Sequence, residues 1–473
     1  MNSPVALFEC FEREARRRPG RSLVRSHGES GDTSAGLLLD EAVRVSRTMR
    51  RSGLRPGGIA LIDRVEGVSL ITAILAAWAV DAAIVAIEKG APAGEAARLR
   101  DLFSPRVLVS KGGGGLCVQS TPAAHVRLPP GCAIIKLTSG STGGPRGIAV
   151  TASQLSADTR RLIRAMRLAR GAVNVAAIPL SHSYGLSVLV MPLVLQGSPV
   201  LLVPSPLPDR LAAALSGGRP VNLPGVPYLF EMLLRCGEAV AIPSPDRTRC
   251  ISAGAPLLPR TASEFRRRFG IPIRVFYGTS ETGGISYDAS AQGDAAFTQG
   301  CVGTPLPGVA VTTEGNARRI VVGSSAVASG YIGPDSKEPA PAGGEFDGRR
   351  FRTGDTGRLD GRGRLRLTGR IGVLVNVSGR KVNPREVETT LRSIDGIADA
   401  AVLAEPDAAR GNALVACLVA ERSLTRERVM AQLHRRLAAY KLPRRFVFLD
   451  RLPVNPRGKL DEATLRREVL RQP

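Results

Sequence analysis

The chain has 473 residues, of which 43% are hydrophobic and 22% charged. A chain of this length accommodates two or three domains, and its composition is that of a globular protein rather than a disordered one. The net charge of +24 comes from 58 arginines and seven lysines against 41 acidic residues, spread along the chain without interleaved aromatic residues. We interpret this excess as a general arginine bias and predict no nucleic-acid binding. The alternative is an acidic partner or a phosphate-rich substrate.

The cysteines and the N-terminal residues indicate the cellular compartment. The seven cysteines are scattered and form no CxxC pair, which argues against a disulfide framework and against a zinc site. Charged residues interrupt the only apolar stretch among the first twenty, unlike a secretory signal. We therefore expect a reducing, cytoplasmic compartment.

One apolar stretch, Leu70–Ile87, approaches the length of a membrane span. Asp81 interrupts it and alanine predominates, so we predict a buried helix at about 69–80 and a buried strand at about 83–87 instead. No membrane span is expected.

Helical and strand-like patterns alternate over about the first 280 residues. This alternation predicts an α/β domain with mostly parallel sheets. Amphipathic patterns predict helices at 41–53, 161–170 and 262–270, and apolar runs predict strands at 58–63, 82–88, 105–110, 132–137, 199–204 and 273–278.

The residue composition and pattern change toward the C-terminus. Residues 303–367 are glycine-rich, with short β-like pieces at 317–323 and 363–370, and the glycine-rich 111–116 is predicted to be a loop. After a break at 368–372, the patterns predict a small α+β unit: strands at 373–377, 399–405 and 412–420, and helices at 384–394 and 425–440. We therefore predict a large domain over 1–370 and a small domain over 371–473, joined by a hinge.

The stretch "LTSGSTGGPRG", Leu137–Gly147, follows an apolar strand pattern. Small residues let successive backbone N–H groups turn toward an anion, hydroxyls add donors, and Arg146 adds a cation suited to phosphate oxygens. The spacing is not that of a Walker loop. On these residues alone, an ordinary surface turn is the alternative to a phosphate-binding loop.

This loop resembles the phosphate-loop signature of the adenylate-forming superfamily, which comprises acyl- and aryl-CoA ligases, peptide-synthetase adenylation domains and luciferases. Seven later stretches resemble the motifs of that superfamily in order: "PLSHSYGL" (179–186), "SAGAPL" (252–257), "YGTSETG" (277–283), "GTPLPG" (303–308), "FRTGDTGRL" (351–359), "GRIGVLVNVSGRKVNPREVE" (369–388) and "PVNPRGKLD" (453–461). The resemblance covers nearly the whole chain. It implies an enzyme in which the carboxylate of the substrate attacks the α-phosphate of MgATP. The enzyme then transfers the acyl group to a thiol.

The resemblance also implies roles for individual residues around ATP. The β- and γ-phosphates would be bound by Thr138, Ser139, Gly140, Ser141, Thr142, Gly143 and Arg146, where Arg146 replaces the lysine more usual in the family. Glu281 would ligate Mg²⁺, and Ser280 would hydrogen-bond a phosphate or the substrate carboxylate; the alternative for Glu281 is a solvated loop carboxylate. The adenine and ribose would contact Gly254, Ala255, Pro256, Tyr277, Gly278, Asp355 and Arg370.

Asp355 offers two acceptor oxygens, which suits the two hydroxyls of a ribose, although an ion pair with an arginine at a strand end is the alternative. Lys459 is the match to the lysine that stabilises the transition state of adenylation, and the alternative is a solvated lysine. A lysine there is not what an arginine-biased composition predicts. Gly372 is the implied hinge, and Gly379 would line the tunnel for the thiol.

The acid and its acceptor are less closely defined. The substrate pocket would include His182, Tyr228 and Gly283, and a core role is the alternative for His182. Peptide-synthetase adenylation domains carry an aspartate that pairs with an amino group, and "PLSHSYGL" contains none, so a fatty or aromatic acid is favoured. CoA is the expected acceptor; an acyl carrier protein and an amine are the alternatives.

Overall fold

The structure is a computed structural model, and it describes residues 1–26, 31–89, 91, 94–122, 126–138, 146–203, 208–215, 219–236, 242, 245–290, 300–333, 344–371, 375–377, 380–382, 384–407, 411–437, 439–455 and 460–470. The helices in these ranges are α1 (Pro4–Arg17), α2 (Ala35–Arg51), α3 (Gly67–Trp78), α4 (Glu95–Phe103), α5 (Ala152–Ala165), α6 (Ser183–Gly185), α7 (Met191–Gln196), α8 (Pro208–Leu215), α9 (Pro227–Arg235), α10 (Pro259–Phe269), α11 (Pro384–Arg392), α12 (Arg426–His434) and α13 (Glu462–Leu470). A π-helical segment, η1 (Leu186–Val190), joins α6 to α7, and short 3₁₀ segments cover Pro245–Arg247 and Ala439–Lys441.

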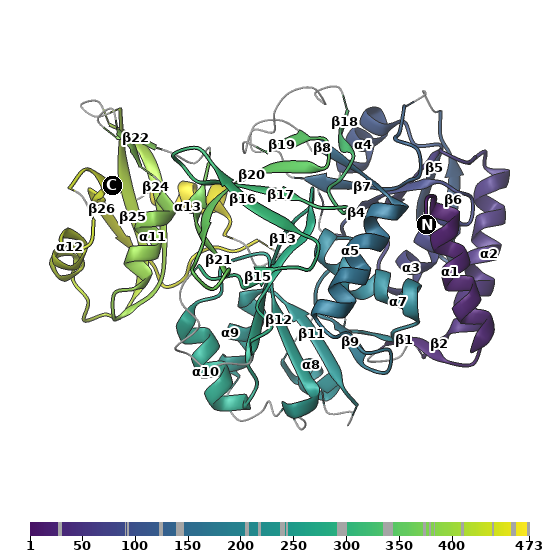
Figure 1. Ribbon diagram of the computed structural model, residues 1–473, viewed down its shortest axis with the longest axis horizontal. Coiled ribbons are helices and arrows are strands. Elements are labelled where there is room, and N and C mark those ends of the chain that lie inside the picture. The colour runs from purple at the N-terminus through teal and green to yellow at the C-terminus, as the bar shows by residue number, and fades with distance from the viewer. Residues whose placement is uncertain are drawn as a thin grey trace.

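Two large sheets form the N-terminal part of the molecule (Figure 1). The first has the order β15-β14-β13-β12-β11-β9-β10-β1-β2, and its strands are β1 (Ser22–Ser26), β2 (Thr33–Ser34), β9 (Val173–Ala176), β10 (Val200–Leu202), β11 (Val221–Gly225), β12 (Thr248–Ser252), β13 (Ile273–Thr279), β14 (Gly283–Tyr287) and β15 (Thr304–Pro305). The second has the order β18-β8-β7-β4-β3-β5-β6, and its strands are β3 (Ile59–Asp63), β4 (Ala83–Ile87), β5 (Val107–Gly112), β6 (Gly115–Ser120), β7 (Cys132–Thr138), β8 (Arg146–Thr151) and β18 (Gly330–Ile332). Both sheets are parallel in the middle and antiparallel at the edges.

A smaller antiparallel sheet follows, in the order β16-β17-β20-β19 with β21 on the other side of β20. Its strands are β16 (Ala310–Glu314), β17 (Arg319–Gly323), β19 (Glu345–Asp347), β20 (Arg350–Leu359) and β21 (Leu365–Arg370). The C-terminal part contains the pair β22 (Val375–Val377) and β23 (Arg380–Val382) and the sheet of β24 (Ile397–Asp407), β25 (Gly411–Ala420) and β26 (Arg445–Phe448). It forms its own lobe, with its own hydrophobic cores, beside the small sheet (Figure 1).

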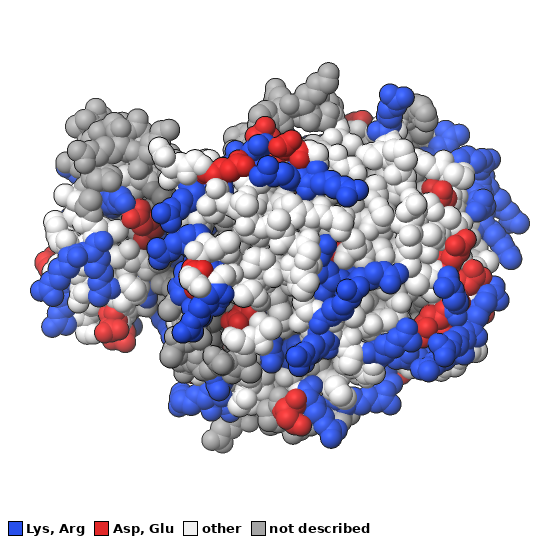
Figure 2. Space-filling view, in the orientation of Figure 1, with Lys and Arg blue, Asp and Glu red and all other residues white. Residues whose placement is uncertain are grey.

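The predicted fold class is confirmed: a large α/β domain with mostly parallel sheets is followed by a small α+β domain. The boundary at 370/371 stays a prediction. Across the two parts, the guanidinium of Arg260 donates a hydrogen bond to the carbonyl oxygen of Ile397 at 3.1 Å. Figure 2 shows Lys and Arg side chains spread over this face of both parts, the distribution that a general arginine bias predicts.

Most predicted elements match the structure within a few residues, and four differ. The predicted helix 41–53 begins too late, because α2 begins at Ala35, after the capping residue Ser34. The predicted helix 161–170 is wrong in its bounds, because the helix begins at Ala152, where Thr151 and Gln154 form a capping box. The loop predicted at 111–116 is wrong, because Gly112 and Gly115 pair at the tip of the β5–β6 hairpin. The predicted helix 425–440 is too long, since α12 ends at His434.

The stretch Leu70–Ile87 folds as predicted, as a buried helix followed by a buried strand, α3 and β4. Trp78, at the end of α3, donates its indole N–H to the carbonyl oxygen of Ala133 in β7 at 3.0 Å. None of the helices in the described ranges combines the length and the apolar character that a bilayer crossing requires.

Two glycines with positive φ differ in the space around them, and this difference gives a stability prediction. Gly303 (φ 82°) has no room for a Cβ atom, which would overlap the backbone of Tyr287 and Asp288, whereas Gly315 (φ 66°) has no neighbour within 4 Å. Gly315→Ala should lower the free energy of unfolding by about 1–2 kcal/mol, the cost of a left-handed alanine. Gly303→Ala should cost roughly 1–3 kcal/mol more, because the backbone must also shift. The measurement is urea denaturation. Equal losses of the free energy of unfolding in the two variants would contradict the packing argument.

Candidate active site

The phosphate-loop motif lies on a hairpin of the second sheet. Leu137 and Thr138 end β7, Arg146 and Gly147 begin β8, and Thr138 pairs with Arg146. The predicted strand 132–137 therefore continues through Thr138, and Arg146 and Gly147, which were expected in the loop, already belong to β8. Five predicted phosphate ligands lie outside the described residues: Ser139, Gly140, Ser141, Thr142 and Gly143; so does the side chain of Thr138.

The motif around Glu281 forms the tight connection between β13 and β14. Thr282 donates its backbone N–H to the hydroxyl oxygen of Thr279 at 3.2 Å, which closes the turn. The carbonyl oxygen of Glu281 accepts the N–H of Ala328 at 2.7 Å, so the turn is tied to the segment before β18. The two glycines at its base are needed for packing, since a Cβ at Gly278 would lie 2.5 Å from the carbonyl oxygen of Gly283.

The carboxylate of Glu281 has a partner that the sequence analysis missed. The hydroxyl of Tyr331 donates to Oε1 of Glu281 at 3.1 Å, and the guanidinium of Arg146 lies 5.8 Å from the centre of the Tyr331 ring. Burial, with the Glu281 carboxylate, raises the pKa of Tyr331 well above its ordinary value, so the phenol keeps its proton and donates. The signal in the sequence was the aromatic residue in "SGYIG", a segment outside the motifs considered.

Asp355 and Tyr277 meet where β20 approaches the first sheet. The hydroxyl of Tyr277 donates to Oδ2 of Asp355 at 2.7 Å, and Nε of Arg370 lies 3.5 Å from Oδ1. Burial, followed by the neighbouring Asp355 carboxylate, raises the pKa of Tyr277. Asp355 therefore does pair with an arginine at a strand end, and the structure brings together three residues that the sequence analysis placed around the nucleoside.

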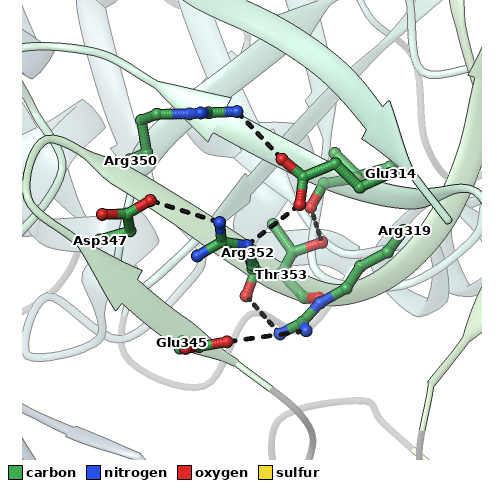
Figure 3. A network of polar contacts seen from close by, with 8 residues as sticks. Glu314, Arg319, Glu345, Asp347, Arg350, Arg352 and Thr353 are labelled. Carbon is green, nitrogen blue, oxygen red and sulfur yellow. Dashed lines mark hydrogen bonds and ion pairs between the residues drawn. The ribbon is translucent and has the colours of Figure 1, made fainter.

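A network of ion pairs holds the strand that carries Asp355 (Figure 3). Glu314 on β16 pairs with Arg350 at 3.1 Å and with Arg352 at 3.0 Å, both on β20, and Arg319 on β17 donates to the carbonyl oxygen of Thr353 at 2.9 Å. Such partly exposed ion pairs each contribute little to stability. They act on the strand next to Asp355. There the backbone of Thr353 is held by Arg319, and the hydroxyl of buried Thr353 accepts the N–H of Asp355 at 3.1 Å.

The histidine motif and the turn of Glu281 touch each other. Nδ1 of His182 accepts the N–H of Tyr184 at 3.3 Å, which caps α6, and the hydroxyls of Ser183 and Ser280 lie 3.0 Å apart. Ser183, which the sequence analysis did not single out, therefore joins two predicted motifs.

The remaining predicted site residues differ in exposure and in packing. Gly254 (φ 85°) and Pro256 are exposed, Ala255 is half-buried, and Tyr228 is 46% exposed in the first turn of α9. At Gly283, a Cβ would lie 2.6 Å from the carboxylate of Asp158, so packing alone requires a glycine there. Lys459, Gly372 and Gly379 lie outside the described residues.

The donor set fits a magnesium ion that arrives with phosphates. Among the described residues, no group of three His, Cys, Asp or Glu side chains is placed to hold a metal ion. Magnesium bound to a nucleotide needs only one or two protein carboxylates, and a half-buried glutamate fixed by one hydrogen bond can supply one.

Family models and known proteins identify the class of enzyme. The model described as "AMP-binding enzyme" matches residues 11–332, and the one described as "AMP-binding enzyme C-terminal domain" matches 386–459. The chain belongs to the AMP-binding enzyme family. It is an AMP-forming ligase of the acyl-CoA synthetase type.

This AMP-binding enzyme is similar to curated and solved proteins along its length. It is 30% identical to a 2-succinylbenzoate–CoA ligase of Enterococcus faecalis over 337 residues, which are 69% of this chain and 68% of that protein. Among solved structures, ATP-bound MatB from Rhodopseudomonas palustris aligns with a TM-score of 0.84 at 23% identity, over 99% of both chains. The amide bond synthetase McbA from Marinactinospora thermotolerans aligns with a TM-score of 0.83 at 23% identity, over 98% of this chain and 99% of the other.

Two tyrosines, half-buried Tyr277 and buried Tyr287, allow the Tyr277–Asp355 contact to be measured. Tyr277→Phe removes a hydrogen bond to a charged group, which should lower the free energy of unfolding by about 1.5–3 kcal/mol. Tyr287, 3% exposed, has no hydrogen-bond partner for its hydroxyl in the described part of the chain, so Tyr287→Phe should be neutral or stabilising. The measurement is denaturant unfolding without nucleotide. Equal effects of the two variants would show that the contact contributes nothing.

Proposed function

We propose that this enzyme activates a carboxylic acid without an amino group, fatty or aromatic, to an acyl-adenylate, and that it then transfers the acyl group to the thiol of CoA. The observation that carries the proposal is one cluster of side chains. The Glu281 carboxylate accepts a hydrogen bond from Tyr331, and the hydroxyl of the adjacent Ser280 pairs with that of Ser183. The similarity to a CoA ligase supports the acceptor.

In the first half-reaction, the substrate carboxylate attacks the α-phosphorus of ATP and pyrophosphate leaves. Arg146, at the start of β8, would bind phosphate oxygens, and Ser280 would offer a hydroxyl to a phosphate or to the substrate carboxylate. Magnesium, when bound with ATP, neutralises phosphate charge, and Glu281 would hold it. Catalysis then rests on positioning and charge, since no covalent enzyme nucleophile is required.

The nucleoside would contact the edge where β20 meets β13. Asp355 has one carboxylate oxygen bonded to Tyr277 and the other facing Arg370 at 3.5 Å, and each oxygen retains a second lone pair for a ribose hydroxyl. Gly254, Ala255, Pro256 and Gly278 would lie along the base. His182, Tyr228 and Gly283 would contribute to the acyl pocket.

An amine is the second candidate acceptor, because a solved protein of the same fold is an amide bond synthetase. An acyl carrier protein is the third, since its acidic surface would suit a chain of net charge +24. All three acceptors share the first half-reaction, so that half is tested first.

The test of the function is ATP–pyrophosphate exchange with a panel of aliphatic and aromatic acids, followed by addition of CoA, a holo carrier protein or amines to the best acid. We expect acid-dependent exchange and then consumption of CoA. Loading of the carrier protein or amide formation without use of CoA would replace the acceptor. No exchange with any acid would contradict the adenylation chemistry.

Lys459 would act in the first half-reaction only, on the resemblance of "PVNPRGKLD" to the family motif, with Gly372 as the hinge that removes it for the second half. Lys459→Ala should abolish pyrophosphate exchange but still convert supplied acyl-adenylate to thioester. Lys459→Arg, which keeps the charge, is the control and should retain part of the exchange. Loss of both half-reactions in Lys459→Ala would refute this division of labour.

A further inference from the structure

One lysine is buried directly beneath the turn that carries Glu281. Lys136 on β7 is only 6% exposed, whereas Lys89 and Lys111 are exposed and Lys441 is half-buried. Burying an ammonium ion is costly unless nearby groups compensate it. The chain holds 58 arginines and only seven lysines, so composition does not favour a lysine in the apolar run "CAIIKL".

The geometry places Lys136 and Tyr331 on one face of the second sheet. Ile148 on β8 pairs with Lys136 on one side and with Tyr331 on the other. Residues directly opposite each other in antiparallel strands project to the same face. From this face Lys136 Nζ lies 3.5 Å from the carbonyl oxygen of Ser280, a long hydrogen bond, and Tyr331 binds the carboxylate of Glu281. Two side chains of the second sheet thus hold successive residues of a turn that belongs to the first.

Asp158 holds the other end of the same turn. This carboxylate, 3% exposed on the inner face of α5, accepts the N–H of Gly284 at 2.9 Å and the hydroxyl of Ser187 at 3.1 Å. Burial lowers the pKa of Lys136, and the charges of Asp158 and Glu281 act in the opposite direction. Lys136 therefore lies within electrostatic reach of both a structural carboxylate and the proposed magnesium ligand.

We propose that Lys136 is a positioning residue, which fixes the Ser280–Glu281 turn so that the Glu281 carboxylate meets the metal ion bound with ATP. This inference rests on the proposed role of Glu281. The alternative role for Lys136 is only to neutralise the buried charge of Asp158.

The experiment measures ATP binding by calorimetry, with Mg²⁺ and with a chelator, together with the kinetics of pyrophosphate exchange. The quantity of interest is the ratio of the ATP affinity with Mg²⁺ to the ATP affinity with the chelator. We call this ratio the magnesium gain, and it reports how well the protein binds ATP and the metal ion together. Glu281→Gln is the reference and should lose most of this gain. Lys136→Met, similar in length but uncharged, should reduce the gain severalfold and lower kcat for exchange roughly ten- to a hundred-fold, with little change in KM for the acid.

A second pair of variants separates positioning from charge neutralisation, and it also serves if Lys136→Met does not fold. Asp158→Asn keeps an acceptor for Gly284 and can reverse its hydrogen bond with Ser187, so it removes the charge that Lys136 would neutralise. The double variant Lys136→Met with Asp158→Asn is compared with Asp158→Asn alone. We expect similar thermal stability but a reduced magnesium gain in the double variant.

The outcomes are distinguishable. If Glu281→Gln keeps the full magnesium gain, the proposed role of Glu281 fails, and the inference about Lys136 fails with it. If Glu281→Gln loses the gain while the Lys136 variants keep it, only the positioning role is overturned. If the double variant matches Asp158→Asn in both stability and magnesium gain, Lys136 merely balances the charge of Asp158.

Discussion

The turn between β13 and β14 is the constraint on which the candidate site depends. It closes a hairpin of the first sheet, yet it is also held by polar contacts from elsewhere: Tyr331 bonds the carboxylate of Glu281, Ala328 bonds the carbonyl oxygen of Glu281, and Asp158 bonds the N–H of Gly284. A turn held only by its own hairpin would be positioned no better than its two strands. Contacts from the second sheet and from α5 therefore make the place of Glu281 a property of the whole N-terminal domain.

The same constraint explains the small residues at this junction. Gly283 is packed against the carboxylate of Asp158 and Gly278 against the carbonyl oxygen of Gly283, and both distances leave no space for a side chain. A motif of small residues therefore does not by itself indicate contact with a ligand. At these two positions, close packing of backbone and carboxylate is a sufficient reason for glycine.

Much of the fold could be predicted from the sequence, because buried strands and amphipathic helices have strong patterns. The errors have physical causes. The start of α5 was missed because its first turn depends on the capping box of Thr151 and Gln154 rather than on apolar periodicity. The β5–β6 hairpin was missed because its glycines resemble a loop, although the strands pair through backbone hydrogen bonds that need no side chain.

Only the residues that belong to family motifs could be assigned to the candidate site from the sequence. Asp355 and Tyr277 were placed near the same ligand, but their mutual hydrogen bond could not be derived, since it joins strands of two different sheets. Lys136, Asp158 and Tyr331 escaped notice for a related reason, because each acts on a residue far away in the sequence. Lys136 and Tyr331 lie on one face of the second sheet, on either side of Ile148, while Asp158 approaches the same turn from α5. β8 begins with Arg146 and pairs with β18, so Arg146 and the tyrosine that binds Glu281 lie on neighbouring strands of one sheet. The second sheet therefore carries both Arg146, the proposed phosphate ligand, and the tyrosine that binds Glu281, the proposed magnesium ligand.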